Sequence, residues 1–140
     1  SDAERRADRG SFFQSIHATL SHILWADQLW MSRLSDWAPP DGPSREVPLY
    51  DDWDALKSRR NEADRTFINW AETLTQADVD GDLEWYSGTL QRGMTSPRAS
   101  CLMQVFNHQT HHRGQVHAML TAAGASPEDT DIPFMPDEYL

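Results

Sequence analysis

The sequence predicts an all-α domain in which long helices pack as a bundle. Apolar residues recur at helical spacing along residues 11–34, 51–74 and 96–122. Four prolines and a glycine lie within residues 36–49, and such a segment cannot form a regular helix. The length of 140 residues fits one domain with a single core, so we expect one helical domain over residues 1–140.

Each expected helix has a recognisable start. Ser11 or Ser15 can cap the first long helix, because a serine hydroxyl accepts a hydrogen bond from a free backbone amide. Asp51 or Asp52 begins the second helix in the same way. The proline-rich residues 36–49 then form a semi-rigid connection between the two helices.

The region before the last helix has the pattern of strands rather than of a helix. Residues 82–94 hold aromatic and aliphatic residues on both sides of Ser87-Gly88, which predicts a short β-hairpin. Ser96 followed by Pro97 predicts the start of the last long helix, and Gly124 its end. The tail, residues 126–140, contains prolines and apolar residues, so we expect it to pack as an irregular strap.

Two histidines interrupt an otherwise apolar face of the last helix. Residues four apart lie on the same side of a helix, so His108 and His112 can converge on one ion. The face they share consists of Cys101, Val105, His108, His112, Val116 and Met119. Burying an unpaired polar group costs about 1–3 kcal/mol. A shared metal ion satisfies both imidazoles, and the pattern therefore favours a metal site.

His22 is the expected third ligand, because it is the one imidazole on a small and apolar face of the first long helix. At about 100° per residue, His111 points away from the direction that His108 and His112 share, and so cannot easily join them. We expect His17 and His117, which also point in other directions, on the surface or behind the ligands. A pair of histidines four apart more often marks a polar helix face. The apolar surroundings and the matching His22 reverse that preference.

Composition and single motifs exclude several function classes. The net charge of -10 and the lack of clustered Lys and Arg argue against nucleic acid and anionic membranes as partners. Gln109 stands where a zincin protease has its catalytic glutamate, so the chain is not a zincin. Cys101 is the single cysteine, which excludes an intramolecular disulfide and indicates an inert core thiol. With no apolar stretch of about 18 residues, a cytoplasmic location is expected.

Two segments carry a family resemblance, QSIHATLSHILWADQLW at 14–30 and FNHQTHHRGQ at 106–115. With the order of the elements, they make the chain similar to the DinB family of the DinB/YfiT-like superfamily. The resemblance implies an up-down four-helix bundle, a homodimer, and a divalent-metal site formed by His22, His108 and His112. Family members have another helix before the first one found here. We therefore expect either that this helix is absent or that residues 1–10 are its truncated remnant. We also expect a partner chain or another segment to cover the open core.

The metal chemistry follows from the ligand set. Three neutral imidazoles leave coordination positions open, which is typical of a catalytic rather than a structural site. The family resemblance favours Zn or Ni as the ion, and implies a metal-dependent hydrolase or a low-molecular-weight thiol S-transferase acting on a small molecule. The alternative is a non-catalytic, metal-binding stress-response protein in which the ion braces the bundle.

The residues around the ligands have more than one interpretation. Asp27 and Gln115 can hydrogen-bond the free ring nitrogens of the ligands. Asp27 can equally form an ion pair with Arg113 between helices. The tryptophans at positions 25, 30, 53, 70 and 85 can line a pocket, although aromatic residues at helical spacing are more often part of a core.

Overall fold

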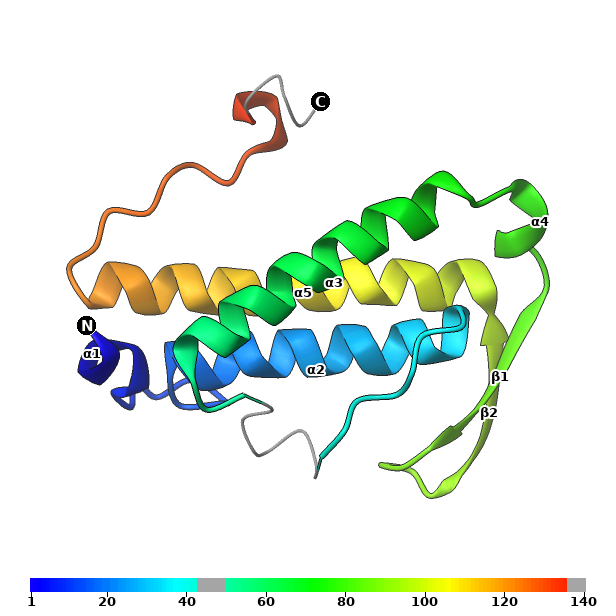
Figure 1. Ribbon diagram of the computed structural model, residues 1–140, viewed down its shortest axis with the longest axis horizontal. Coiled ribbons are helices and arrows are strands. Elements are labelled where there is room, and N and C mark those ends of the chain that lie inside the picture. The colour runs from blue at the N-terminus through cyan, green and yellow to red at the C-terminus, as the bar shows by residue number, and fades with distance from the viewer. Residues whose placement is uncertain (43–49, 136–140) are drawn as a thin grey trace.

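An antiparallel pair of long helices forms the body of the protein, and a third helix crosses it (Figure 1). The computed structural model describes residues 1–42 and 50–135. The pair consists of α2 (Ile16–Leu34) and α5 (Arg98–Ala122), and the crossing helix is α3 (Trp53–Glu72). The remaining elements are α1 (Asp2–Arg6), α4 (Gln76–Val79), β1 (Asp82–Ser87), β2 (Arg92–Pro97) and the short 3-10 helix η1 (Ile132–Phe134).

The fold is mostly helical, with 59% of the described residues in helices, and this part of the chain also forms one small antiparallel sheet, as the sequence predicts. Three long helices are present in the described part of the chain, so the fourth helix of the bundle stays an expectation. Residues 43–49 of the proline-rich connection and residues 136–140 of the tail lie outside the described residues.

The start of α2 is fixed by a serine cap. The Ser15 side chain accepts a hydrogen bond from the Ala18 backbone amide at 3.2 Å, so Ser15, not Ser11, is the cap. Ser11 instead lies in a tight turn, where the Gln14 amide donates to its carbonyl at 2.8 Å. Gly10 has φ +71°, a conformation that glycine adopts without steric cost. The chain therefore turns sharply before α2 begins.

The other two long helices begin and end close to where the sequence predicts. The Asp52 side chain caps α3 by accepting from the Ala55 amide at 2.7 Å. The helix α5 ends at Ala122, and Gly124 follows with φ +82°. The predicted Ser96 cap is wrong, because Ser96 belongs to β2 and pairs with Leu83.

The hairpin lies where the sequence predicts, but its second strand reaches further, to Pro97. Its register pairs Asp82 with Pro97 and Ser87 with Arg92. Leu83 is buried and packs with Leu34, Cys101 and Val105 in the main core cluster. This packing stabilises two strands that are too short to be stable alone.

The core consists of three clusters that join the helices. The first joins α2, α5 and the hairpin, the second joins α2 and α5, and the third joins α2 and α3. Trp30, Trp70 and Trp85 pack against the first cluster, and Trp53 packs against the third. These four tryptophans are partly buried and pack on the core, and two of them, Trp53 and Trp85, also line clefts, so both interpretations given above apply.

The described part of the tail does not pack as a strap. Ile132 and Phe134 are 71% and 70% exposed, and Figure 1 shows the chain leaving the end of α5 and running clear of the helix pair. Within residues 1–42 and 50–135, no helix is both long and apolar enough to cross a lipid bilayer.

Candidate metal centre

The α2–α5 pair brings the three predicted histidines together. His22 comes from α2, and His108 and His112 come from adjacent turns of α5. The Nε2 atom of His108 lies 3.1 Å from Nε2 of His22 and 3.1 Å from Nε2 of His112. One nitrogen from each ring lies within 4.8 Å of the other two. Residues 86 positions apart in the chain therefore meet at one point.

The nitrogen geometry fits a divalent ion. Zinc–nitrogen bonds are about 2.0–2.1 Å long, so nitrogens at two corners of a zinc tetrahedron are about 3.3 Å apart. The two separations of 3.1 Å are close to that value. In the described residues, no thiol or carboxylate joins the cluster. The donor set found here is three imidazoles, which would leave at least one position of a four-coordinate ion to a ligand from outside the protein.

The protonation of the rings also suits metal binding. Burial, together with the neighbouring His112 and His111, lowers the pKa of His108 from 6.5 to about 4. Burial likewise lowers the pKa of His112. Both imidazoles are therefore neutral at physiological pH, and a metal ligand must have an unprotonated ring nitrogen.

Gln115 fixes the tautomer of one ligand. Its Oε1 lies 2.7 Å from Nδ1 of His112, and because an amide oxygen only accepts, Nδ1 must carry the proton and donate it. The lone pair of His112 is then on Nε2, the atom that faces the other two histidines. The amide nitrogen of Gln115 lies 3.2 Å from Nε2 of His111. His111 thus stands behind the centre, and the hydrogen bond expected between Gln115 and a ring nitrogen of the histidine cluster is present.

An aromatic wall covers one side of His22. The ring of Phe13 stacks on this imidazole with centroids 3.9 Å apart, and its centroid lies 5.5 Å from that of His112. The ring of Trp25 lies 6.2 Å away from His22, so one of the five tryptophans does border the site. Sequence reasoning missed Phe13, because it lies in the turn before α2, where no helical period applies.

Asp27 lies away from the centre, so both roles expected for it are wrong. Its carboxylate pairs with Arg60 of α3 at 2.5 Å and accepts from Gln109 of α5 at 2.9 Å. Asp27 is 1% exposed, and burial raises the pKa of its carboxyl, partly offset by these two partners. The group links three helices instead of orienting a ligand.

The other histidines lie outside the centre, as predicted. His17 is nevertheless deeply buried, and its Nε2 atom lies 2.8 Å from the carbonyl oxygen of Tyr50. Because a carbonyl oxygen only accepts, Nε2 of His17 donates. The expectation of a surface position or one behind the ligands is wrong for His17, since the chain entering α3 covers it.

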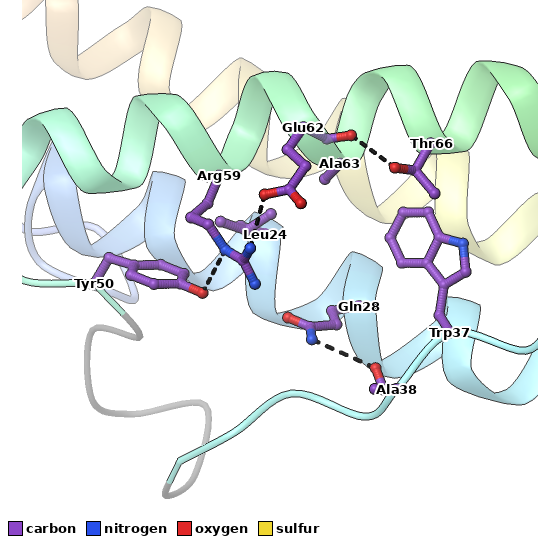
Figure 2. Close-up of a pocket in the computed structure, with 9 residues that line it drawn as sticks. All are labelled: Leu24, Gln28, Trp37, Ala38, Tyr50, Arg59, Glu62, Ala63 and Thr66. Carbon is purple, nitrogen blue, oxygen red and sulfur yellow. Dashed lines mark hydrogen bonds and ion pairs between the residues drawn. The ribbon is translucent and has the colours of Figure 1, made fainter.

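A separate cleft of about 270 Å³ lies between α2, α3 and the segment after α2 (Figure 2). Its polar groups are already engaged. Arg59 donates to the Tyr50 hydroxyl at 2.9 Å and pairs with Glu62 at 2.7 Å, and Gln28 donates to the Ala38 carbonyl at 3.4 Å. No histidine lines this cleft, and the histidine centre is the stronger candidate.

Comparison with known proteins agrees with the resemblance read from the sequence. The chain is similar in structure to a DinB-like protein from Bacillus cereus ATCC 10987, with a TM-score of 0.69 and 19% sequence identity. The match covers 94% of this chain and 83% of that one, and at this identity it shows a shared fold. No curated protein matches the chain in sequence. The sequence profile of the DinB family matches residues 1–139, and the chain therefore belongs to the DinB family.

Proposed function

We propose that the protein is a divalent-metal-dependent enzyme acting on a small molecule. The supporting observation is the convergence of the Nε2 atoms of His22, His108 and His112. Imidazole ligands suit Zn and Ni, and the family resemblance selects these two ions from the larger set that imidazole accepts. When bound, such an ion lowers the pKa of a coordinated thiol or water and so supplies a nucleophile near neutral pH.

The residues of the chain itself hold the ion, orient its ligands and shield one side of the site. The three histidines hold the ion, and Gln115 keeps His112 in the required tautomer. Phe13 covers His22 and excludes water from that side. His108 is only partly buried, which supports access for a substrate. No protein group completes the coordination among the described residues.

Thiol S-transfer is the favoured reaction, with hydrolysis second. A hydrolase of the zincin type uses a carboxylate as general base, whereas Asp27 is held by Arg60 and Gln109 and Gln109 itself replaces the zincin glutamate. A thiol has a pKa near 8.5 and water near 15.7, so a thiol needs much less activation. In the proposed reaction the thiol proton goes to solvent, a sulfur–carbon bond forms, and the leaving group departs from the electrophile.

The alternative is a non-catalytic metal protein in which the ion braces α2 against α5. A fourth protein ligand and full burial of all three rings would favour it. His22 and His112 are each 7% exposed, as a bracing ion requires, whereas the partial exposure of His108 favours the enzyme.

The test begins with the metal. Elemental analysis of protein purified without added metal is expected to find about one Zn or Ni per chain in the wild type and none in His108→Ala. The loaded protein is then screened for coupling of small thiols to an activated aryl chloride, and for hydrolysis of esters and amides. Turnover by the wild type and none by His108→Ala supports the enzyme. Bound metal with no turnover in either screen, together with a melting temperature raised by the ion, supports the bracing alternative.

A further inference from the structure

A cleft of about 320 Å³, the α3–α5 cleft, lies between α2 and the two helices α3 and α5. Its wall is apolar and includes Leu20, Ile23, Trp53 and Leu56. Ile23 and Leu56 are 5% and 3% exposed, so the wall of the cleft is continuous with the core. An apolar wall of this kind favours a partner that brings apolar side chains of its own.

The polar residues of the α3–α5 cleft are more basic than acidic. Its lining includes Lys57, Arg60 and Arg113 but only one carboxylate, Asp64. Arg60 pairs with two carboxylates, and Lys57 pairs with Asp54 at 2.8 Å. In the described part of the chain Arg113 is exposed and is in no ion pair. A chain of net charge -10 thus has an unpaired cation beside an apolar wall, which favours an acidic and apolar partner.

The apolar surface continues beyond the cleft along both helices. Phe106 lies three residues before Gln109 on α5, and Ile68 lies four residues after Asp64 on α3, so each extends a rim of the cleft. Their exposed fractions are 49% and 59%. The rings of Phe67 and Phe106 have centroids 5.9 Å apart, which brings the two helices together at this point. The surface is therefore elongated, as a docking site for an extended segment must be.

The tail has the complementary features. Ile132, Phe134 and Met135 are 71%, 70% and 37% exposed. The Met135 amide donates to the Ile132 carbonyl at 3.0 Å, and in a 3-10 turn residues three apart lie on the same side. Residues 126–135 contain no Lys, Arg or His. The acidic residues of this segment are Glu128, Asp129 and Asp131. The tail is therefore an acidic segment with exposed apolar side chains.

We infer that residues 126–135 of one copy of the chain dock in the α3–α5 cleft of a second copy. Ile132 and Met135 then cover the apolar wall, and the acidic residues lie beside Arg113. When each copy receives the tail of the other, the two contacts are identical and the pair is closed and symmetric. The inference goes beyond the proposed function and needs no metal ion, and it names the segment that would hold the homodimer together.

The path of the tail selects a second copy rather than its own cleft. Figure 1 shows the chain leaving the end of α5 and running clear of its own helix pair. The seven residues from Ala125 to Ile132 span up to about 23 Å when extended, which is enough to reach a neighbouring molecule. One sequence supplies both the acidic apolar segment and the cleft with the free cation, so no other protein is required.

Sedimentation velocity of the full chain at several concentrations gives the dissociation constant of the dimer. Ile132→Ser/Met135→Ser and Arg113→Glu should each raise it by at least about 10-fold, because each removes a central contact of the interface. Leu90→Ser and Arg92→Glu are the matched controls at exposed positions of the hairpin, and they should leave it unchanged. An unchanged constant in the tail variant, or an equal loss in the controls, would overturn the inference.

Exchange of charge between tail and cleft tests the pairing itself. Asp129→Arg/Asp131→Arg should weaken the dimer, as Arg113→Glu does. Combined in one chain, the three substitutions place opposite charges face to face again, and most of the lost affinity should return. A combined variant as weak as Arg113→Glu alone would show that the acidic residues of the tail do not lie beside Arg113.

A disulfide trap distinguishes a second copy from the tail's own chain. Asn61→Cys places a thiol in the cleft and Thr130→Cys places one in the tail, while the native Cys101 is buried. Oxidation of the metal-free double variant should give a covalent dimer of twice 16.0 kDa, whereas each single variant and Thr89→Cys/Thr130→Cys should stay uncrosslinked. A crosslinked monomer would show that the tail enters its own cleft. That result, or no crosslink at all, would overturn the inference and leave the proposed metal centre untouched.

Discussion

At the scale of single residues, the proposed centre depends on how the three imidazole rings are oriented. An imidazole has two nitrogens, and the centre requires that the same one, Nε2, faces inward from all three rings. For His112 the requirement is met by the acceptor on its other nitrogen, Gln115. A change at these positions should therefore remove metal binding, whereas a change at nearby histidines should not.

The first prediction tests the ligand set. His22→Ala, His108→Ala and His112→Ala should each lower zinc affinity by at least about 100-fold, because each leaves only two imidazole ligands to bind the ion. The matched controls His111→Ala and His117→Ala should stay within about 10-fold of the wild type. Competition with a chromogenic chelator measures these affinities. A loss in His111→Ala as large as in His108→Ala would mean that a different face of α5 binds the ion.

The second prediction concerns the stability of the metal-free protein against pH. The pKa of His108 falls from 6.5 to about 4 on folding because of burial and neighbouring histidines. Between these values the unfolded chain binds a proton that the folded one does not. The free energy of unfolding should therefore decrease as the pH falls from 6.5 to 4, by on the order of 1–2 kcal/mol after allowance for solvent screening at a partly exposed ring.

Urea unfolding at several pH values measures this decrease. His108→Gln removes the titrating group and should make the dependence on pH shallower over the same range. The variant His117→Gln, at a partly buried position, serves as a control for the loss of a histidine elsewhere on α5. An identical slope in wild type and His108→Gln would show that the ring of His108 is not responsible.

At the scale of elements, one buried carboxylate ties the crossing helix to the helix pair. Asp27 of α2 contacts Arg60 of α3 and Gln109 of α5. Arg60 also pairs with Asp64 on its own helix at 2.5 Å. The apolar contacts of α3 with α2 involve Leu24, Leu56 and Ala63. The contacts of Asp27 with Arg60 and Gln109 therefore fix how the helices are oriented, while the apolar residues form the rest of the α2–α3 interface.

The third prediction tests this network. Asp27→Ala should lower the free energy of unfolding by about 2–3 kcal/mol, because Arg60 keeps a partly buried charge without its interhelical partner. The double variant Asp27→Ala/Arg60→Met should recover at least half of the loss, since the partly buried charge, which only Asp64 still offsets, is then gone. Chemical denaturation of the single and double variants measures both. Equal loss in the two variants would indicate that packing, not charge, explains the effect.

At the scale of the whole molecule, the assembly state stays a prediction. Apolar residues are exposed on α5 and in the tail, among them Met103, Phe106 and Phe134. Met103 and Phe106 lie three residues apart and so share a face of α5, and a contiguous exposed apolar face is typical of surfaces that associate. The family resemblance indicates a homodimer as the assembly that covers them.

The fourth prediction is the mass in solution. Light scattering of the purified chain should give twice 16.0 kDa at micromolar concentration, and Phe106→Ser should shift the population toward the monomer. Tyr86→Ser is the matched control, because it removes an exposed aromatic residue from the hairpin. A monomer at all concentrations would contradict the homodimer.

Much of the fold follows from short-range patterns. Caps and stops are local, because a side chain or a glycine acts on a backbone group within about four positions, so Ser15, Asp52 and Gly124 could be found in the sequence. The pairing of His108 with His112 is local as well, because residues four apart share a helix face. Ser96 misled the same reasoning, since a strand continued to Pro97 and took the residue into the sheet.

The amino-acid order was thus sufficient for the three long helices, the hairpin and the three histidines that lie together. Spacing along a helix predicts which side of the helix a residue faces, but it does not predict which residue of another element will contact it. The partner of Asp27, the aromatic cover supplied by Phe13 and the burial of His17 depend on how helices and turns cross in space. Those contacts join residues distant in the chain, and their selection is a matter of packing between elements rather than of any repeating pattern.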